Sequence, residues 1–139
     1  HPDGLGPTVF CHGSPRSDSE ILTTETTEQR LRTIIEDVDQ SVIVCGHTHR
    51  QFDRRVDRWR VVNAGSVGMP YEGRPGAYWA LFGPGVESRR TEYDLDAAVG
   101  ELRAGRYPDL EEMLKESLVE PADPDDVARF FEGSAAGAG

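Results

Sequence analysis

Two short hydrophobic runs lie on either side of an amphipathic segment in the first third of the chain. Thr8–Gly13 and Ser41–Gly46 each predict a short buried strand that ends at a glycine. The continuous Val/Ile run of the second strand indicates that both of its faces are covered. Spacing of i, i+3, i+4 and i+7 places one hydrophobic helix face on Leu31, Ile34, Ile35 and Val38. The order strand, helix, strand predicts a parallel βαβ unit.

Polar residues mark the start of this helix and the turns that follow it. Thr26 and Gln29 form a capping-box pattern, which predicts that the helix begins after Thr26. Beyond the second strand, residues 51–56 and 59–65 flank Asp57-Arg58 and predict a tight hairpin. A second hairpin is predicted at Pro84-Gly85. Its second strand has few hydrophobic residues, so we expect it at a sheet edge or with one face in water.

The pattern becomes helical from Asp94 onward. Three helices are predicted, with Asp94, Asp109 and Asp123 at their starts and Gly105 and Gly133 as stops. Hydrophobic residues share a face on the second helix (Leu110, Met113, Leu114) and on the third (Val127, Phe130, Phe131). Because such faces must be buried, we expect these helices to pack on the flank of the sheet. The predicted division is a domain at residues 1–94, a helical extension at 95–132 and a flexible tail at 133–139.

Composition excludes several classes of protein. The chain has 139 residues and a formal net charge of −10, which argues against non-specific nucleic-acid binding and a basic membrane-surface patch. No hydrophobic run approaches the roughly 20 residues of a transmembrane helix, and no signal peptide opens the chain. Two cysteines, Cys11 and Cys45, are too few for a disulfide framework, which predicts a cytoplasmic protein with reduced thiols. His1 stands where a translated chain has methionine, so we expect further sequence upstream.

Three of the four histidines follow predicted strands: His12 after the first, and His47 and His49 after the second. Ligands bind beyond the carboxyl ends of strands in α/β sheets. His47 and His49 are two residues apart, so an extended backbone would point both rings to one side. Three converging neutral imidazoles are typical of a transition-metal site. The alternative for each histidine is a hydrogen-bonded structural role.

Three segments, "VFCHGSP", "VIVCGHTHRQF" and "VVNAGSVGMP", together resemble the calcineurin-like metallophosphoesterases, in particular small bacterial members. The resemblance runs from about Pro7 to Asp94, with "NAGS" where "NPGS" is common. It implies an α/β fold, the C-terminal part of a four-layer α/β/β/α sandwich, followed here by C-terminal helices. It also implies two divalent ions, with manganese preferred and iron, zinc, nickel or magnesium as alternatives.

Residue roles follow from the same resemblance. It places His12 and His47 on the second metal and His49 on the first, with Thr48 facing away in a packing role. Arg16 is a candidate for contact with a substrate phosphate, since arginine suits bidentate oxygen contacts, and a surface-loop role is the alternative. Asn63 is a candidate substrate contact near the family's active site, with shaping of the turn as the alternative.

The family also has a DxH motif, a bridging Asp and a GNH motif whose histidine is the expected proton donor. None of these precedes "VFCHG". We therefore expect this chain to be a fragment, inactive alone, of a phosphoesterase in which a metal-bridging hydroxide attacks phosphorus. The substrate classes left open are a phosphomonoester, a phosphodiester, a dinucleoside polyphosphate and a phosphoprotein. A homo-oligomer is left open. The alternatives are a non-catalytic scaffold or binding module on the same fold and a small stand-alone histidine-metal protein.

Overall fold

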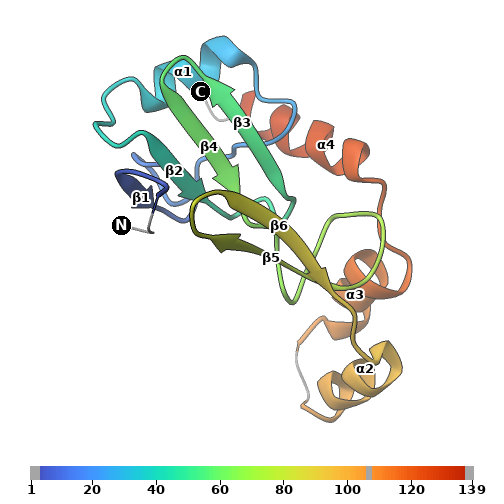
Figure 1. Cartoon of the computed structure of the whole chain (residues 1–139). Coiled ribbons are helices and arrows are strands. Elements are labelled where there is room, and N and C mark those ends of the chain that lie inside the picture. The colour runs from blue at the N-terminus through green and yellow to red at the C-terminus, as the bar shows by residue number, and fades with distance from the viewer. Residues whose placement is uncertain (1–3, 106–107, 137–139) are drawn as a thin grey trace.

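A computed structural model describes residues 4–105 and 108–136 of the chain (Figure 1). His1 and the end of the expected tail, residues 137–139, lie outside the described residues. The strands are β1 Thr8–Phe10, β2 Val42–Cys45, β3 Phe52–Val56, β4 Trp59–Asn63, β5 Ala77–Phe82 and β6 Val86–Thr91. The helices are α1 Glu28–Ile35, α2 Leu95–Ala104, α3 Leu110–Leu114, the π-helix η1 Lys115–Val119 and α4 Pro124–Ala136.

The predicted βαβ unit is confirmed by a four-stranded sheet with the order β1-β2-β4-β3. β2 pairs in parallel with β1 on one side and with β4 on the other, while β3 and β4 are antiparallel. All four residues of β2 are buried, as its continuous hydrophobic run predicts. Ile43 and Cys45 pack into the same core as Leu31 and Ile35 of α1, so the helix covers one face of this sheet.

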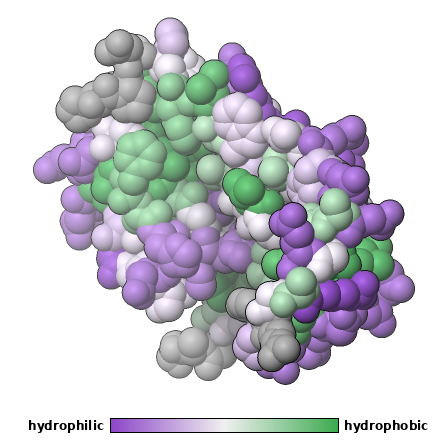
Figure 2. Space-filling model, turned by 90° about the horizontal axis from the view of Figure 1, so that it is seen from below, coloured by the Kyte–Doolittle hydropathy of each residue, from purple (hydrophilic) through white to green (hydrophobic). Residues whose placement is uncertain are grey.

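β1 forms where the sequence predicts a strand, but it is not buried. Its residues are half-buried or exposed, and Phe10 is 61% exposed. The reason is its position, since β1 is an edge strand and no described strand pairs with its outer side. Hydrophobic side chains gather on part of the face seen in Figure 2. An open sheet edge of this kind is what the expected fragment would present.

Both predicted hairpins are present. β3 and β4 are joined at Asp57 and Arg58, with Asp57 in the left-handed region at φ 51°. β5 and β6 form a separate two-stranded antiparallel sheet, and most of β6 is exposed, as expected. Figure 1 shows this second sheet in front of the first, on the face opposite α1. The side chain of Gln51 links the two sheets by donating to the carbonyls of Ala64 and Trp79 at 3.2 and 2.8 Å.

The start of α1 lies one residue later than predicted. Thr27, not Thr26, is the N-cap, and its hydroxyl accepts a hydrogen bond from the Arg30 amide at 3.2 Å. Thr26 is instead buried, and its hydroxyl accepts from the Thr23 amide and donates to Glu132. The capping-box pattern therefore predicted the helix correctly but placed its N-cap at Thr26. The side chain of Thr26 makes a tertiary contact with Glu132 instead.

The first two C-terminal helices do not pack on the sheet, contrary to expectation. Leu110 and Leu114 of α3 share a small separate core with Val99 of α2 and Leu118 of η1. The hydrophobic face predicted for the second helix is thus buried against α2 and η1. Figure 1 shows α2 and α3 away from the four-stranded sheet. Asp94 caps α2 as predicted, since its carboxylate accepts from the Ala97 amide at 3.0 Å.

α4 does pack against the main body. Glu132 accepts hydrogen bonds from Thr23 at 2.7 Å and from Arg30 at 2.9 Å, both near the start of α1. The carboxylate of Asp123 accepts from the amides of residues 125 and 126 and so caps α4 as predicted. The predicted stop at Gly133 is wrong, because the helix continues to Ala136 and includes residues assigned to the tail.

The described chain is therefore a mixed α/β structure, as the sequence predicts. Its core lies between α1 and the four-stranded sheet. Within the residues described, no helix combines the length and the hydrophobicity needed to cross a bilayer.

Candidate functional site

His12 and His47 lie side by side at the carboxyl ends of two neighbouring strands. β1 and β2 are parallel and in register, with Phe10 opposite Val44, so the residues that follow them emerge at one sheet edge. Nε2 of His12 and Nδ1 of His47 are 3.2 Å apart, and the ring centroids are 5.0 Å apart. The Gly46 amide donates to the His12 carbonyl at 2.8 Å and fixes the two turns to each other.

The backbone of the His-Thr-His segment is not extended, which corrects the sequence interpretation. His47 and His49 have φ values of 65° and 55°, in the left-handed region that non-glycine residues rarely occupy. Each such residue costs of order 1 kcal/mol or more and persists only where the surroundings impose it. As a result, the rings of His47 and His49 have different partners.

Thr48 and Asn63 impose this turn from the interior. Thr48 is buried, and its hydroxyl donates to the Leu22 carbonyl at 2.9 Å. Asn63 has no exposed surface, and its amide nitrogen donates to the Gly46 carbonyl at 2.7 Å and to the Thr48 hydroxyl at 3.1 Å. Its amide oxygen accepts from the Gly65 amide at 2.9 Å. Thr48 thus faces away from the histidines, as predicted.

His49 is held by the loop between β4 and β5. Its Nδ1 lies 2.9 Å from the Met69 carbonyl, which can only accept, so Nδ1 carries the proton and Nε2 keeps its lone pair. The Tyr71 ring stacks on the imidazole at 5.7 Å with an interplanar angle of 18°. The Tyr71 amide also donates to the His49 carbonyl at 3.1 Å. These contacts fix both the tautomer and the orientation of the ring.

The surroundings of His49 favour its neutral form. Burial lowers its pKa, and the nearby imidazoles of His47 and His12 lower it further, while the hydrogen bond with the Met69 carbonyl acts in the opposite direction. A neutral imidazole is the form that binds a metal ion.

The chemistry of the His12–His47 pair fits a divalent metal ion. Nitrogen ligands at about 2.0–2.1 Å from one ion lie about 2.8–3.4 Å from each other at octahedral or tetrahedral angles. The observed 3.2 Å separation of Nε2 and Nδ1 falls in this interval. The same separation also suits a hydrogen bond in which one proton lies between the two nitrogens. Within residues 4–105 and 108–136, no group of three or more His, Cys, Asp or Glu side chains is arranged to hold an ion, and His49 does not join the pair.

The two candidate substrate contacts have other roles in this structure. Asn63 is fully buried with its amide engaged in the turn, so the shaping role replaces the predicted substrate contact. Arg16 pairs with Glu20, to which it donates from Nε at 2.9 Å and from a terminal nitrogen at 2.5 Å. Glu20 also accepts from the Ser14 hydroxyl at 2.6 Å, and these bonds lower the pKa of its carboxyl. The loop after His12 is therefore held by hydrogen bonds between its own side chains.

Sequence reasoning missed the contribution of the loop at residues 64–76. This segment supplies the Met69 and Tyr71 contacts to His49 and the Glu72 carboxylate, which accepts from the Gln51 amide at 2.5 Å. Burial raises the pKa of Glu72. The length of this loop could have indicated its role, because a loop of more than about 12 residues between two strands is uncommon and is usually functional.

The cysteines beside the histidines are suited to packing. Cys45 is buried, and this raises the pKa of its thiol to about 12. Burial also raises the pKa of Cys11, whose thiol donates to the Val44 carbonyl at 3.5 Å. A thiol that stays protonated is a poor nucleophile and a poor metal ligand.

Comparison with known proteins gives a family and a fold. The sequence profile of the calcineurin-like phosphoesterase superfamily domain matches residues 4–82, which include all three segments that carry the resemblance. Among solved structures, the chain is similar to hypothetical protein PH1004 from Pyrococcus horikoshii OT3, with a TM-score of 0.71, 20% identity, and coverage of 88% of this chain and 50% of that one.

The chain is also similar to a metallophosphoesterase from Sphaerobacter thermophilus. The TM-score is 0.64 at 23% identity, with coverage of 78% of this chain and 54% of the other. At these identities the likeness shows the fold alone, and the chain spans about half the length of both structures. Comparison with curated proteins gives no match.

Proposed function

This chain belongs to the calcineurin-like phosphoesterase superfamily, and from that premise we propose that it supplies three histidine ligands of a two-metal phosphoesterase site. The observation that carries the proposal is the 3.2 Å approach of His12 Nε2 to His47 Nδ1 at the carboxyl ends of two parallel strands. In this proposal His12 and His47 hold one ion, and His49 offers its free Nε2 to a second. Manganese is the ion we expect.

Each part of the chain has a distinct task in this proposal. Divalent ions would supply the Lewis acidity that activates water and neutralises charge on phosphate. The Met69 carbonyl and the Tyr71 ring keep the imidazole of His49 in one tautomer and one orientation. Partners of this kind commonly change metal affinity or activity by about 10–100-fold when they are mutated.

Charge balance requires further ligands. Two dications a few ångströms apart repel each other, and three neutral imidazoles bring no negative charge to offset this repulsion. Among the described residues no carboxylate joins the histidines. We infer that carboxylates from polypeptide outside this chain complete the site, and that the chain alone binds at most one ion, weakly, and hydrolyses little.

A hydrolysis assay tests this proposal. With manganese and a generic aryl phosphodiester, we expect little turnover from the chain alone and substantial turnover from a longer polypeptide that contains it. In the longer polypeptide His47→Ala should lower kcat by orders of magnitude, because a lost ligand disturbs the ion and the water that it activates. Unchanged turnover in that variant would contradict the proposal. No turnover in the unmodified longer polypeptide would favour the non-catalytic scaffold.

A further inference from the structure

A groove of about 490 Å³ lies against the aromatic partner of His49. Its volume is in the range of small-molecule sites. Most of its wall is hydrophobic or aromatic, with three charged side chains. The lining residues are Tyr71, Lys115, Glu120, Ala122, Asp126, Val127, Phe130 and Phe131.

A continuous series of rings connects the groove to the histidine site. Tyr71 stacks on His49 at 5.7 Å and meets Phe131 at 6.0 Å, and Phe131 meets Phe130 at 6.1 Å. The groove therefore begins one ring away from His49. Figure 1 shows the loop between β4 and β5, which carries Tyr71, reaching toward α3 and α4.

The groove wall is anchored to the site. Arg50, the residue after His49, donates to the Pro124 carbonyl at 2.8 Å and to the Asp125 carboxylate at 2.9 Å. These bonds hold the first turn of α4, which also carries Asp126 and Val127 of the groove. The start of α4, whose residues form part of the groove wall, is thus bonded directly to the residue that follows His49.

The composition of the groove suits a neutral aromatic occupant. Phe130 is 71% exposed, the highest value among the exposed large hydrophobic side chains in the part of the chain that is described. Glu120 pairs with Lys115 at 3.8 Å and Asp126 pairs with Arg129, so the charges of the rim largely balance. A balanced rim neither repels a neutral ring nor attracts an anion, and exposed aromatic rings stack well on planar groups.

We propose that this groove binds the organic part of the phosphoester substrate, and that this part is a neutral planar aromatic group such as a nucleobase. The phosphate would lie at the histidines, and the aromatic group would pass the Tyr71 ring and stack on Phe130 and Phe131. This inference rests on the proposed function, because it assigns a substrate class to the same site.

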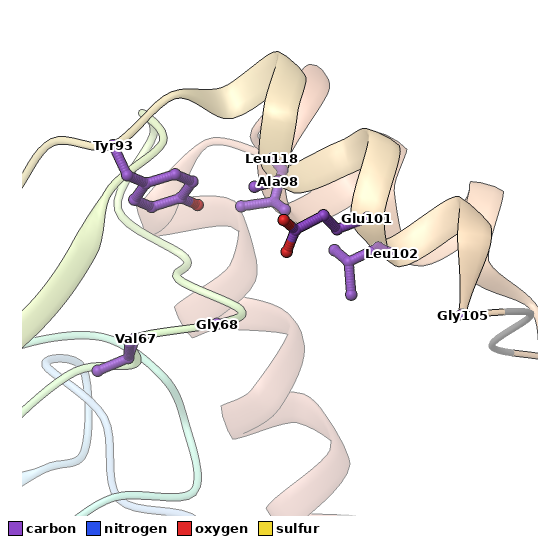
Figure 3. A pocket seen from close by; sticks show the side chains of 8 residues that line it. All are labelled: Val67, Gly68, Tyr93, Ala98, Glu101, Leu102, Gly105 and Leu118. Carbon is purple, nitrogen blue, oxygen red and sulfur yellow. The ribbon is translucent and has the colours of Figure 1, made fainter.

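A second cavity of about 490 Å³ lies beside α2 and is the alternative location (Figure 3). Its lining includes Val67, Tyr93, Glu101 and Leu102, and Figure 3 shows the Glu101 carboxyl group on the side facing Tyr93. Within residues 4–105 and 108–136, no hydrogen bond or ring contact joins these lining side chains to a site histidine, whereas Tyr71 contacts His49 directly. We therefore assign the aromatic subsite to the groove at Tyr71.

Binding of three probes to the full chain tests the proposal. Adenosine carries only the aromatic part, ribose 5-phosphate carries only the phosphate, and adenosine monophosphate carries both. Dissociation constants are measured by calorimetry with manganese present. We expect adenosine monophosphate to bind most tightly. Phe130→Ala should weaken the binding of adenosine and adenosine monophosphate about tenfold, because loss of one stacking partner typically has this effect. The affinity for ribose 5-phosphate should not change.

Two variants control for non-specific effects. Phe10→Ala removes another exposed ring, 61% exposed and outside the groove, and should leave all three affinities unchanged. Tyr93→Ala alters the second cavity and should also have no effect. Because Phe130 is exposed, its replacement should leave the thermal midpoint of the chain unchanged, which is measured alongside.

The outcomes separate this inference from the proposed function. Absence of saturable adenosine binding, or an effect of Tyr93→Ala in place of Phe130→Ala, overturns the groove assignment even if ribose 5-phosphate binds with manganese. If adenosine binds through Phe130 but ribose 5-phosphate shows no manganese-dependent binding, the groove binds aromatic groups without serving a phosphoester site. The subsite is then overturned together with the proposed function.

Discussion

At the scale of single residues, the site depends on two buried polar side chains, Asn63 and Thr48, that shape the turn. Asn63 and Thr48 bind the turn that carries His47 and His49 in left-handed conformations. Those conformations are unfavourable, so the hydrogen bonds of Asn63 must offset their cost. The orientation of the histidines is therefore fixed from the interior of the sheet.

Replacement of Asn63 tests this dependence. Asn63→Ala would remove three hydrogen bonds. The Gly46 carbonyl, the Thr48 hydroxyl and the Gly65 amide would each lose their bond to the Asn63 side chain. We expect the free energy of unfolding to fall by about 2–3 kcal/mol, measured by urea denaturation. Ser88→Ala, at an exposed position of β6, serves as the control. A loss below about 0.5 kcal/mol for Asn63→Ala would show that the turn holds without this network.

Part of the site could be predicted at this scale and part could not. His12, His47 and His49 were predicted to converge because they follow two hydrophobic strands, and the structure brings His12 and His47 together without His49. The left-handed backbone of His47 and His49 was not predicted, because a local pattern cannot show that Asn63, 14 and 16 residues away, imposes it. For the same reason the stacking of Tyr71 on His49 was not foreseen.

At the scale of elements, hydrophobic periodicity predicted α1, β2 and both hairpins, because those features depend on neighbours in sequence. The exposure of β1 depends on what pairs with its outer edge, which the sequence of the strand does not contain. The packing of α4 depends on Glu132, whose partner Thr26 is 106 residues earlier in the chain. The sequence pattern at Thr26 was therefore interpreted as a helix cap, whereas its hydroxyl binds Glu132 of α4.

Removal of the Glu132 carboxylate should loosen α4. Thr23 and Thr26 are both buried, so Glu132→Ala leaves their hydroxyl groups without their acceptor. We expect a loss of about 1–3 kcal/mol in the free energy of unfolding. The exposed Glu112 of α3 provides the matched control Glu112→Ala. Equal stability of the two variants would mean that α4 is held by other contacts.

The β3–β4 hairpin should show a defined pH dependence. Arg60 donates to both carboxylate oxygens of Asp53 at 2.8 and 2.6 Å and holds the pKa of Asp53 below its usual range. A carboxyl group whose folded pKa is depressed stabilises the fold above its unfolded pKa of about 4, and this contribution is lost as pH falls through the folded value. We expect Asp53→Asn to be less stable than the unmodified chain at pH 7.

The stability difference should shrink as the pH is lowered below about 4 and vanish once Asp53 is protonated in the folded chain. Urea denaturation of both chains across this range measures it. Asp96→Asn, at an exposed position of α2, controls for general effects of charge removal. A difference of constant size from pH 7 to pH 2 would contradict the assigned role of the Asp53–Arg60 pair.

At the scale of the whole molecule, the chain combines part of a site with an open sheet edge. The histidines, the loop at residues 64–76 and α4 form a connected arrangement through His49, Tyr71 and Arg50. β1 leaves its outer edge free of any described strand. Both features agree with a chain that spans about half the length of the two similar structures.

The central claim is that His12 and His47 together bind one divalent ion. The most direct test is nitrogen NMR of the imidazole rings during titration of the chain with zinc, a diamagnetic ion that imidazole binds well. The account predicts that the largest nitrogen shifts occur at Nε2 of His12 and Nδ1 of His47, in parallel, and that His47→Ala abolishes the shift at His12. Unchanged nitrogen resonances of His12 and His47 at saturating zinc would contradict it.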